Sequence, residues 1–414
     1  MPTYRKGELF CGPGGLSLGA KQAVVIDEEG NRVLDENGEE YKVEHAWAND
    51  FHQDTVKTFR KNILELDKDD EESELAQSVK SGDVKELDIE SLPPVQIFAF
   101  GFPCNDFSLV GETKGLEGEY GGLYTYGIKV LNHHNPLAFI AENVGGLESA
   151  NEGKAFVQIL KAMEEAGEHG YYITPHKYRF EEYGVPQARH RIIIVGIRKD
   201  LGKKFLVPEA PYKNREQWTT ARQALENPSI PDDATNHEFT NHQNQVVEML
   251  SHIRPGDNCW VDYLPEHLRL NVKGAKMSNI YRRLDPDAPS YTVTGSGGGG
   301  THIYHYAEPR ALTNRERARL QTFPDWYEFV GGKESVRRQI GMAVPPKGAK
   351  IIVEAVLKTL AGVTYPTEEA KWDEEHIQEM LKTGENKKKK RSGKAKKEQA
   401  TKGQTAMELE ETKS

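Results

Sequence analysis

Two side chains that could carry covalent and acid–base chemistry lie just beyond apolar runs typical of buried strands. Cys104 follows residues 95–102, and Glu142 directly follows residues 137–141. A thiol becomes a nucleophile once it ionises. A carboxyl at the edge of a buried sheet is costly to ionise, which favours a proton donor. Pro103 ends the first strand abruptly and favours a functional thiol; a structural cysteine and a helix-capping glutamate are the alternatives.

Two arginines, Arg189 and Arg191, alternate at the start of a third apolar run, residues 192–197. Alternate residues of a strand face the same side. If residues 171–178 pair with this run as a hairpin at the sheet edge, the antiparallel last strand begins where the strands before the thiol and the carboxyl end. We therefore expect both guanidinium groups to converge on those two side chains, with generic phosphate binding as the alternative.

A glycine-rich segment, FCGPGG at residues 10–15, lies between a predicted strand and a predicted helix. Glycine lets the backbone approach a ligand closely, and a helix N-terminus adds hydrogen-bond donors. The spacing matches neither the phosphate loop with its lysine nor the GxGxxG dinucleotide fingerprint, so a tight turn is the alternative. Asp50, at the end of the next strand, would fit a ligand that carries a ribose, and Asp83 could contact an adenine amino group.

The elements that must position these groups alternate between strands and helices over residues 1–200. One helix is predicted over residues 155–166, where apolar positions recur three and four apart. This alternation predicts an open, mostly parallel sheet with helices on both faces. Residues 24–43 contain two turn-like units between β-branched runs, which predicts a hairpin.

The rest of the chain has a different pattern. Residues 201–310 are rich in Pro, Asn, His and Gly and show little helical periodicity, which predicts a separate, irregular, β-leaning domain. Helical periodicity returns over residues 313–321 and 350–360, where we expect the chain to rejoin the first domain. Residues 366–382 are predicted to form a short acidic helix, and the lysine-rich residues 383–414 are predicted to be disordered.

The composition limits the class of protein. The 414 residues are 37% apolar and 29% charged, which excludes a fully disordered chain, and no apolar run is long enough to predict a membrane span. Three cysteines form no disulfide framework, no CxxC pair indicates zinc, and the first residues lack an apolar signal segment, so an intracellular location is expected.

The net charge of −10 is unevenly distributed along the chain: residues 1–200 carry 21 Lys/Arg and 35 Asp/Glu, whereas residues 383–414 carry 10 and 5. A nucleic-acid partner is therefore not excluded, since recognition depends on local charge.

Taken in chain order, these segments and three later ones resemble the DNA cytosine-5 methyltransferases, from Glu8 to about Leu360. FCGPGG resembles the S-adenosylmethionine loop of that family. Pro103-Cys104 resembles its nucleophile motif, Glu142-Asn-Val its ENV motif, and QARHR at residues 187–191 its QxRxR motif. The segments that resemble the end of the recognition domain and the closing cofactor motif are RLDP at 283–286 with YTVT at 291–294, LTNRERARLQTFP at 312–324, and GMAVPP at 341–346.

Three positions depart from the family pattern. Asn105 stands where the family usually has Gln, Asp50 where Glu is commoner, and Met342 where the closing motif usually has Asn. Because Cys104, Glu142 and both arginines are retained, the resemblance implies intact chemistry.

The resemblance also implies the architecture. The expected fold is α/β, the class I S-adenosylmethionine-dependent methyltransferase fold: a Rossmann-like, mostly parallel sheet with an antiparallel last strand, plus a smaller, irregular, β-rich target-recognition domain. Residues 1–200 would form the catalytic and cofactor-binding domain and residues 201–310 the target-recognition domain. Residues 311–365 would be a hinge and return to the catalytic domain, followed by an acidic helix and lysine-rich tail at 366–414.

The implied reaction transfers a methyl group from S-adenosylmethionine to carbon 5 of a cytosine flipped out of duplex DNA, without a metal. Cys104 would add to carbon 6, Glu142 would donate a proton towards nitrogen 3, and Arg191 would hold the exocyclic oxygen. Arg189 would orient the base or lower the pKa of the thiol. The residues implied to bind the cofactor are Phe10, Gly12, Gly14, Gly15, Leu16, Asp50, Phe51, Asp83, Val84, Pro103, Leu123 and Ala343.

The implied partner is double-stranded DNA, with no membrane. A monomer is expected in the bacterial cytoplasm, associated with the nucleoid through DNA, together with a cognate restriction endonuclease that acts on the same site. Two alternatives stay open. One is a tRNA cytosine-5 methyltransferase, which the long segment 201–310 disfavours. The other is a catalytically inactive DNA-binding regulator, which the retained catalytic residues disfavour.

Overall fold

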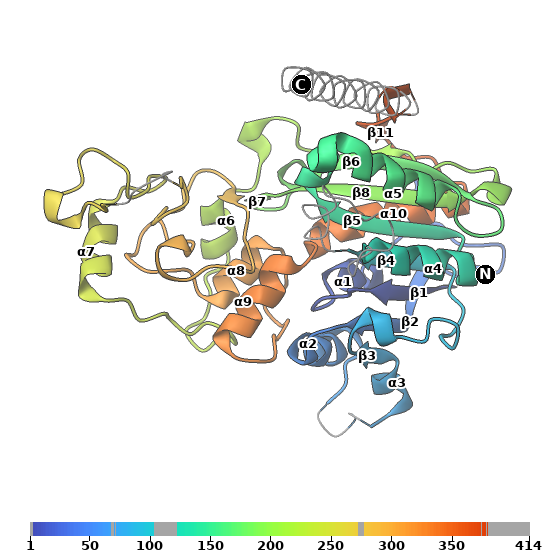
Figure 1. The fold of residues 1–414 in the computed structure, drawn as a ribbon, viewed down its shortest axis with the longest axis horizontal. Helices are drawn as coiled ribbons and strands as arrows, with labels where there is room; N and C mark the ends of the chain where they lie inside the picture. The colour runs from blue at the N-terminus through green and yellow to red at the C-terminus, as the bar shows by residue number, and fades with distance from the viewer. Residues whose placement is uncertain are drawn as a thin grey trace, which may run out of the picture.

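The computed structural model describes residues 3–67, 70, 72–102, 122–271, 277–373, 375–377 and 379. Figure 1 shows a larger lobe built on a sheet and a smaller, irregular lobe beside it. The sheet has seven strands in the order β3-β2-β1-β4-β5-β8-β6. These strands are β1 (Thr3–Leu9), β2 (Lys42–Asp50), β3 (Val79–Ser81), β4 (Ile97–Gly101), β5 (Ala138–Val144), β6 (Tyr171–Arg179) and β8 (His190–Arg198).

The pairing of the strands brings the chemical groups to one edge. All neighbours from β3 to β5 pair in parallel, whereas β8 runs antiparallel between β5 and β6. This confirms the predicted mostly parallel sheet and the predicted pairing of residues 171–178 with the last strand. Because β8 is antiparallel, its first residues lie at the edge where β4 and β5 end: Glu142 is opposite Ile193, and Val144 is opposite Arg191.

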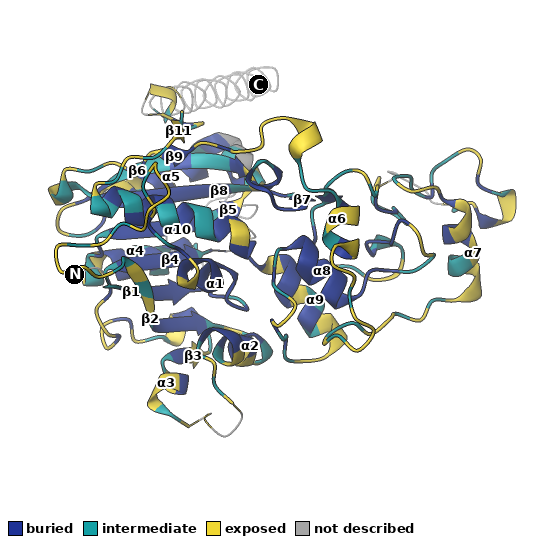
Figure 2. Cartoon of the chain, turned by 180° about the vertical axis from the view of Figure 1, so that it is seen from behind, coloured by how far each residue is buried: buried dark blue, intermediate teal, exposed yellow. Residues whose placement is uncertain are grey.

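Helices cover both faces of the sheet, which explains why its central strands are continuous apolar runs. α4 (Tyr124–His134) and α5 (Lys154–Glu164) pack on one face, and α1 (Gly15–Lys21) and α10 (Pro346–Ala361) pack on the other (Figures 1 and 2). α2 (Gln53–Ile63) and α3 (Glu74–Gln77) lie near the β3 edge. α10 begins earlier than the periodicity predicts, because its Pro346 occupies a first-turn position that needs no N–H donor.

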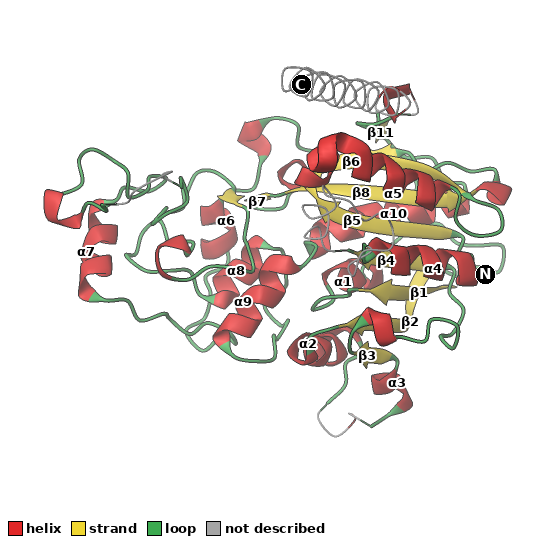
Figure 3. Ribbon diagram, in the orientation of Figure 1, coloured by secondary structure: helices red, strands yellow, loops and turns green. Residues whose placement is uncertain are grey.

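The smaller lobe contains α6 (Ala221–Glu226), α7 (Asn244–His252), α8 (Asn314–Leu320) and α9 (Lys333–Met342), as Figure 3 shows. β10 (Ser290–Tyr291) pairs with β7 (Gln187–Ala188). The described part of residues 201–310 is irregular, as predicted, but it holds more helix than strand, so the expectation of a β-rich domain is wrong. Side-chain bonds to the backbone replace strand pairing there: the Arg283 guanidinium donates to the carbonyls of Leu250, Ile253, His305 and Tyr306.

The boundaries between the lobes differ from the predicted ones at residues 200 and 311. Phe205 and Ala210 pack in the core of the larger lobe, and β9 (Val207–Pro208) pairs with β11 (Thr367–Glu368). α8 and α9 lie in the smaller lobe, so the chain returns to the sheet at α10 (Figure 1). Long-range contacts decide this placement, since Arg315 of α8 donates to the carbonyl of Thr235 at 2.9 Å.

Two shorter predictions have different outcomes. Residues 24–43 form two successive turns with bridges Ile26–Arg32 and Leu34–Glu40, in agreement with the predicted hairpin. The predicted acidic helix over 366–382 is wrong at its start, because β11 occupies part of that range and Trp372 packs edge-on against Phe156. No helix in the part of the chain that the structure describes is long and apolar enough to cross a membrane.

Three histidines are held neutral by burial. Burial lowers the pKa of His45 to about 3 and the pKa values of His176 and His302 to about 4. In an unfolded chain these rings titrate near pH 6.5. Below that pH the unfolded chain binds more protons than the folded chain, so the free energy of unfolding falls as the pH falls.

We expect the free energy of unfolding to be about 2–4 kcal/mol lower at pH 5.5 than at pH 7.5, because each such histidine contributes about 1.4 kcal/mol per pH unit below 6.5. Urea denaturation at the two pH values measures this difference. His45→Gln should remove about a third of it, whereas His169→Gln, at an exposed position, should leave it unchanged. Equal free energies of unfolding at both pH values would contradict the prediction.

Candidate active site

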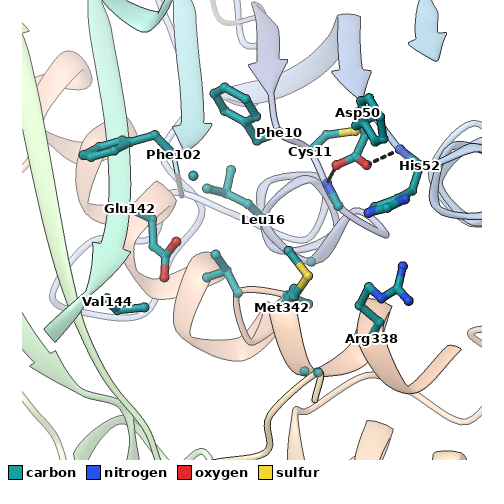
Figure 4. A pocket seen from close by; sticks show the side chains of 18 of the residues that line it. Phe10, Cys11, Leu16, Asp50, His52, Phe102, Glu142, Val144, Arg338 and Met342 are labelled. Carbon is teal, nitrogen blue, oxygen red and sulfur yellow. Dashed lines mark hydrogen bonds between the residues drawn. The ribbon is translucent and has the colours of Figure 1, made fainter. Parts of the chain in front are cut away.

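A cavity of about 1170 Å³ lies where the carboxyl ends of β1, β2, β4 and β5 meet the start of β8 and the helix α9. Figure 4 shows Glu142 and Val144 on one side, Asp50 on the opposite side, and Met342 and Arg338 of α9 facing them. The volume exceeds the range usual for a single small ligand. The cavity therefore has room for two groups side by side.

The glycine-rich loop forms the wall at Asp50. The N–H of Gly12 donates to Asp50 Oδ2 at 2.9 Å, and the N–H of His52 donates to Oδ1 at 3.0 Å. Burial raises the pKa of Asp50, and these two backbone N–H groups oppose that shift. Burial also raises the pKa of the neighbouring Cys11 thiol, and the Asp50 carboxylate adds to this effect, so Cys11 is not suited to act as a nucleophile.

The same loop is fixed from behind by the segments around α9. A Cβ on Gly15 would lie 2.1 Å from the carbonyl oxygen of Val344, so only glycine fits there. Gly14 has a φ of 93°, which favours glycine. Because Gly14 has no side chain, there is space beside it for the hydroxyl of Tyr327, which donates to the carbonyl of Pro13. The packing of the smaller lobe thus sets the position of the loop.

Glu142 and Arg191 form the polar group on the opposite wall. Arg191 Nε lies 3.0 Å from Glu142 Oε1, and both side chains are about nine-tenths buried. Burial lowers the pKa of Arg191, and the Glu142 carboxylate opposes this shift. Glu142 belongs to β5 itself rather than following it, and Asn143 Nδ2 donates to the carbonyl of Phe102 at 2.8 Å, which fixes the end of β4 against β5.

Arg189 has a different arrangement from the one predicted. Its guanidinium donates to the carbonyls of Val293 (3.0 Å), Gly341 (3.1 Å) and Ala343 (3.0 Å), and the side chain is fully buried. Burial lowers the pKa of Arg189 to about 9. Only Arg191 therefore meets Glu142. Arg189 joins the last strand to the segment after β10 and to the C-terminal end of α9, where the last carbonyls of the helix have no partner within it.

The remaining predicted residues fall into three groups. Cys104 lies outside the described residues, together with Pro103 and Asn105. Gly14 does not line the cavity. The predicted cofactor residues that do line it are Phe10, Gly12, Gly15, Leu16, Asp50, Phe51, Asp83, Val84, Leu123 and Ala343.

The sequence analysis missed several residues that line the cavity. Glu8 is buried in β1 and accepts hydrogen bonds from Lys6 and Ser17. The sequence signal for the pair Lys6 and Glu8 was the presence of two charged residues at alternate positions of a strand that is otherwise mostly buried. Further lining residues that were not among the predicted site residues include Asn143, His52, Thr294, Ser296, Glu334, Arg337 and Arg338, which reach the cavity through tertiary packing. Within the described ranges, no group of three or more His, Cys, Asp or Glu side chains is placed to hold a metal ion.

Comparisons with known proteins identify the family of the chain. A model of the family described as C-5 cytosine-specific DNA methylase matches residues 4–358. The chain is 62% identical over 378 residues to the Type II methyltransferase M.BbvI of Brevibacillus brevis, covering 90% of this chain and 96% of that protein. It is 40% identical over 356 residues to the Type II methyltransferase M.NgoFVII of Neisseria gonorrhoeae, covering 84% and 85%.

A solved structure shares the fold. A putative DNA modification methyltransferase encoded within an E. coli prophage superposes with a TM-score of 0.61 at 21% identity, covering 86% of this chain and 99% of that chain. The family match over most of the chain and the high identity to M.BbvI lead to one conclusion: the chain belongs to the C-5 cytosine-specific DNA methylase family.

Proposed function

We propose that this chain transfers a methyl group from S-adenosylmethionine to carbon 5 of a cytosine flipped out of a specific duplex DNA sequence. The observation that carries the proposal is the shared cavity, with the Glu142–Arg191 pair on one wall and Asp50 with the glycine-rich loop on the other. The names of M.BbvI and M.NgoFVII as Type II methyltransferases support a role in protecting host DNA within a restriction–modification system.

The residues on the Asp50 side fit S-adenosylmethionine. Asp50 and Asp83 offer carboxylate oxygens to ribose hydroxyl and adenine amino donors, while Phe51, 66% exposed, and Val84 offer apolar surface to a purine ring. When bound, S-adenosylmethionine supplies an electrophilic methyl group. The close approach of the Gly15 backbone to Val344 keeps this wall rigid.

The residues on the opposite side would act on the cytosine. The Cys104 thiolate would form a bond to carbon 6, which makes carbon 5 nucleophilic. Glu142 would donate a proton towards nitrogen 3, where negative charge develops, and Arg191 would bind the exocyclic oxygen. After carbon 5 is methylated, loss of its proton to water breaks the carbon–sulfur bond and releases Cys104.

The substrate atoms are inaccessible inside a duplex, so the base must leave the stack. The smaller lobe would hold the duplex and read base edges, while the sheet lobe holds the extruded base. We propose that the chain does this as a monomer in the bacterial cytoplasm, on the site that a cognate restriction endonuclease recognises.

Bisulfite sequencing of DNA from cells that express the chain tests the proposal. Cytosines in one sequence context should resist conversion, and those in cells without the chain should not. Methylated tRNA with unmethylated DNA would favour the tRNA activity. DNA binding without methylation would favour an inactive regulator. Either result would overturn the proposed function.

A further inference from the structure

Arg317 of α8 is a buried cation whose side chain differs in its contacts from the neighbouring arginines. Its side chain is 2% exposed, no described residue hydrogen-bonds to its guanidinium, and Nη2 is fully enclosed. Its neighbours on the same helix differ. Arg315 donates to Thr235, Pro324 and Tyr327, and Arg319 pairs with Asp325. Arg317 therefore differs from Arg315 and Arg319, whose side-chain contacts stabilise the smaller lobe.

Two of the groups around Arg317 add positive charge or an unpaired ring nitrogen, whereas Glu316 favours the charged form of Arg317. Arg337 of α9 lies beside it, with Nε buried and unpaired, and the buried His302 ring has an unpaired Nδ1. Burial, followed by the charge of Arg337, lowers the pKa of Arg317 to about 10, so Arg317 is still charged at neutral pH.

Two carboxylates lie near this cluster in the described part of the chain, Glu316 and Glu334, and neither hydrogen-bonds to it. Both oxygens of the buried Glu316 accept hydrogen bonds from Arg310, and one of them also accepts from the N–H of Thr313. Glu334 is exposed and only approaches Arg337, with Nη2 3.7 Å from Oε1. A buried guanidinium group beside a partly buried one, neither of them hydrogen-bonded to a carboxylate of the described residues, is unfavourable for folding. An anionic ligand would remove this cost.

The cluster is next to the cavity. Arg337 lines the cavity together with Thr294, Gly295, Ser296 and Gly297. We propose that Arg317 and Arg337 together bind one phosphate of the DNA backbone, with His302 as a further donor, and so hold the duplex against the smaller lobe. This proposal rests on the proposed function, because it takes DNA as the substrate.

A DNA phosphate fits this cluster better than the cofactor does. Guanidinium groups bind phosphate oxygens through paired N–H donors. The residues that suit the adenosyl group, Asp50 and Asp83, are acidic and belong to the sheet lobe. Residues 201–310 carry 12 Lys/Arg and 13 Asp/Glu, so their charges nearly cancel. Local positive charge on α8 and α9 would therefore supply an attraction to DNA that the smaller lobe as a whole lacks.

The test compares Arg317→Met and Arg337→Met with two controls. DNA dissociation constants are measured between 50 and 200 mM salt. In each variant we expect about tenfold weaker binding and a salt slope smaller by about one, as for the loss of one phosphate contact. Arg32→Met, which removes a charge from the distant hairpin, should leave the slope unchanged. Arg317→Lys should restore part of the affinity.

A stability measurement separates binding from structure. Arg317→Met should keep or raise the melting temperature, since it removes an unpaired buried charge, whereas Arg315→Met should lower it because three carbonyls lose their donor. A lower melting temperature for Arg317→Met with an unchanged salt slope would mean that Arg317 is structural, and the proposal would be overturned.

Two further experiments identify which molecule supplies the anion that the cluster binds. Duplexes with one neutral methylphosphonate should show a single position that weakens wild-type binding but not binding by Arg317→Met. If no such position is found and inorganic phosphate still stabilises the wild type, the cluster is a site for a free anion and the proposal is overturned. A raised dissociation constant for S-adenosylmethionine with an unchanged salt slope would assign the cluster to the cofactor and overturn it as well. The binding arms need no methyl transfer, so they can succeed even if the proposed function fails.

Discussion

Cys104→Ser is expected to lower the rate of methyl transfer to DNA by at least about 1,000-fold, because a serine hydroxyl is a far weaker nucleophile than a thiolate at neutral pH. Transfer of tritium from labelled S-adenosylmethionine measures the rate. The variant should also form no covalent complex with a duplex that carries 5-fluorocytosine at the target position, whereas the wild type should be trapped on it.

The matched control is Cys259→Ala, which removes a buried thiol in the smaller lobe. It should retain the covalent complex. Wild-type rates of transfer in Cys104→Ser, or a trapped complex in that variant, would show that the carbon–sulfur bond is not part of the reaction.

Glu142→Gln is expected to slow a single turnover by about 100- to 10,000-fold, the range for loss of a general acid. Glutamine keeps the size of the side chain, but it cannot donate a proton towards the ring nitrogen and it leaves the largely buried Arg191 without its ion pair. Rapid-quench measurement with saturating DNA and cofactor isolates the chemical step.

Glu148→Gln provides a control at a nearby carboxylate, which pairs with Lys177 and Lys371 instead. It should change the single-turnover rate by less than about threefold. If Glu142→Gln retained the wild-type rate, proton donation by this carboxyl would be excluded, whatever the outcome for Cys104.

Much of the fold could be predicted because its signals are local. Continuous apolar runs indicated β4, β5 and β8 within a few residues of their ends. The helical spacing over residues 313–321 indicated α8, and the structure adds a capping box at Thr313. The antiparallel last strand was also expected, and it places Arg191 at Glu142.

The content and limits of the smaller lobe could not be predicted in this way. Its loops are held by buried side chains such as Arg283, which bond to carbonyls distant in the sequence. Proline, glycine and asparagine indicate turns, but they do not say which distant groups will satisfy the backbone between them. For the same reason α9 was not predicted as a helix within residues 311–365, which were expected to form a hinge and the return to the catalytic domain.

The sequence by itself determined the types and order of the chemical groups: the acid at 142, the arginine at 191, the glycine-rich loop and Asp50 each follow or begin a recognisable element. Only the tertiary structure decided which of them meet. It joined Arg191 to Glu142, bound Arg189 to backbone carbonyls instead, buried Glu8 beside the loop, and left Arg317 Nη2 without a hydrogen bond to the described residues. The reason is physical: strand and helix patterns depend on neighbours in the chain, whereas burial and pairing of charges depend on packing between segments that are 152 and 154 residues apart in the case of Arg189.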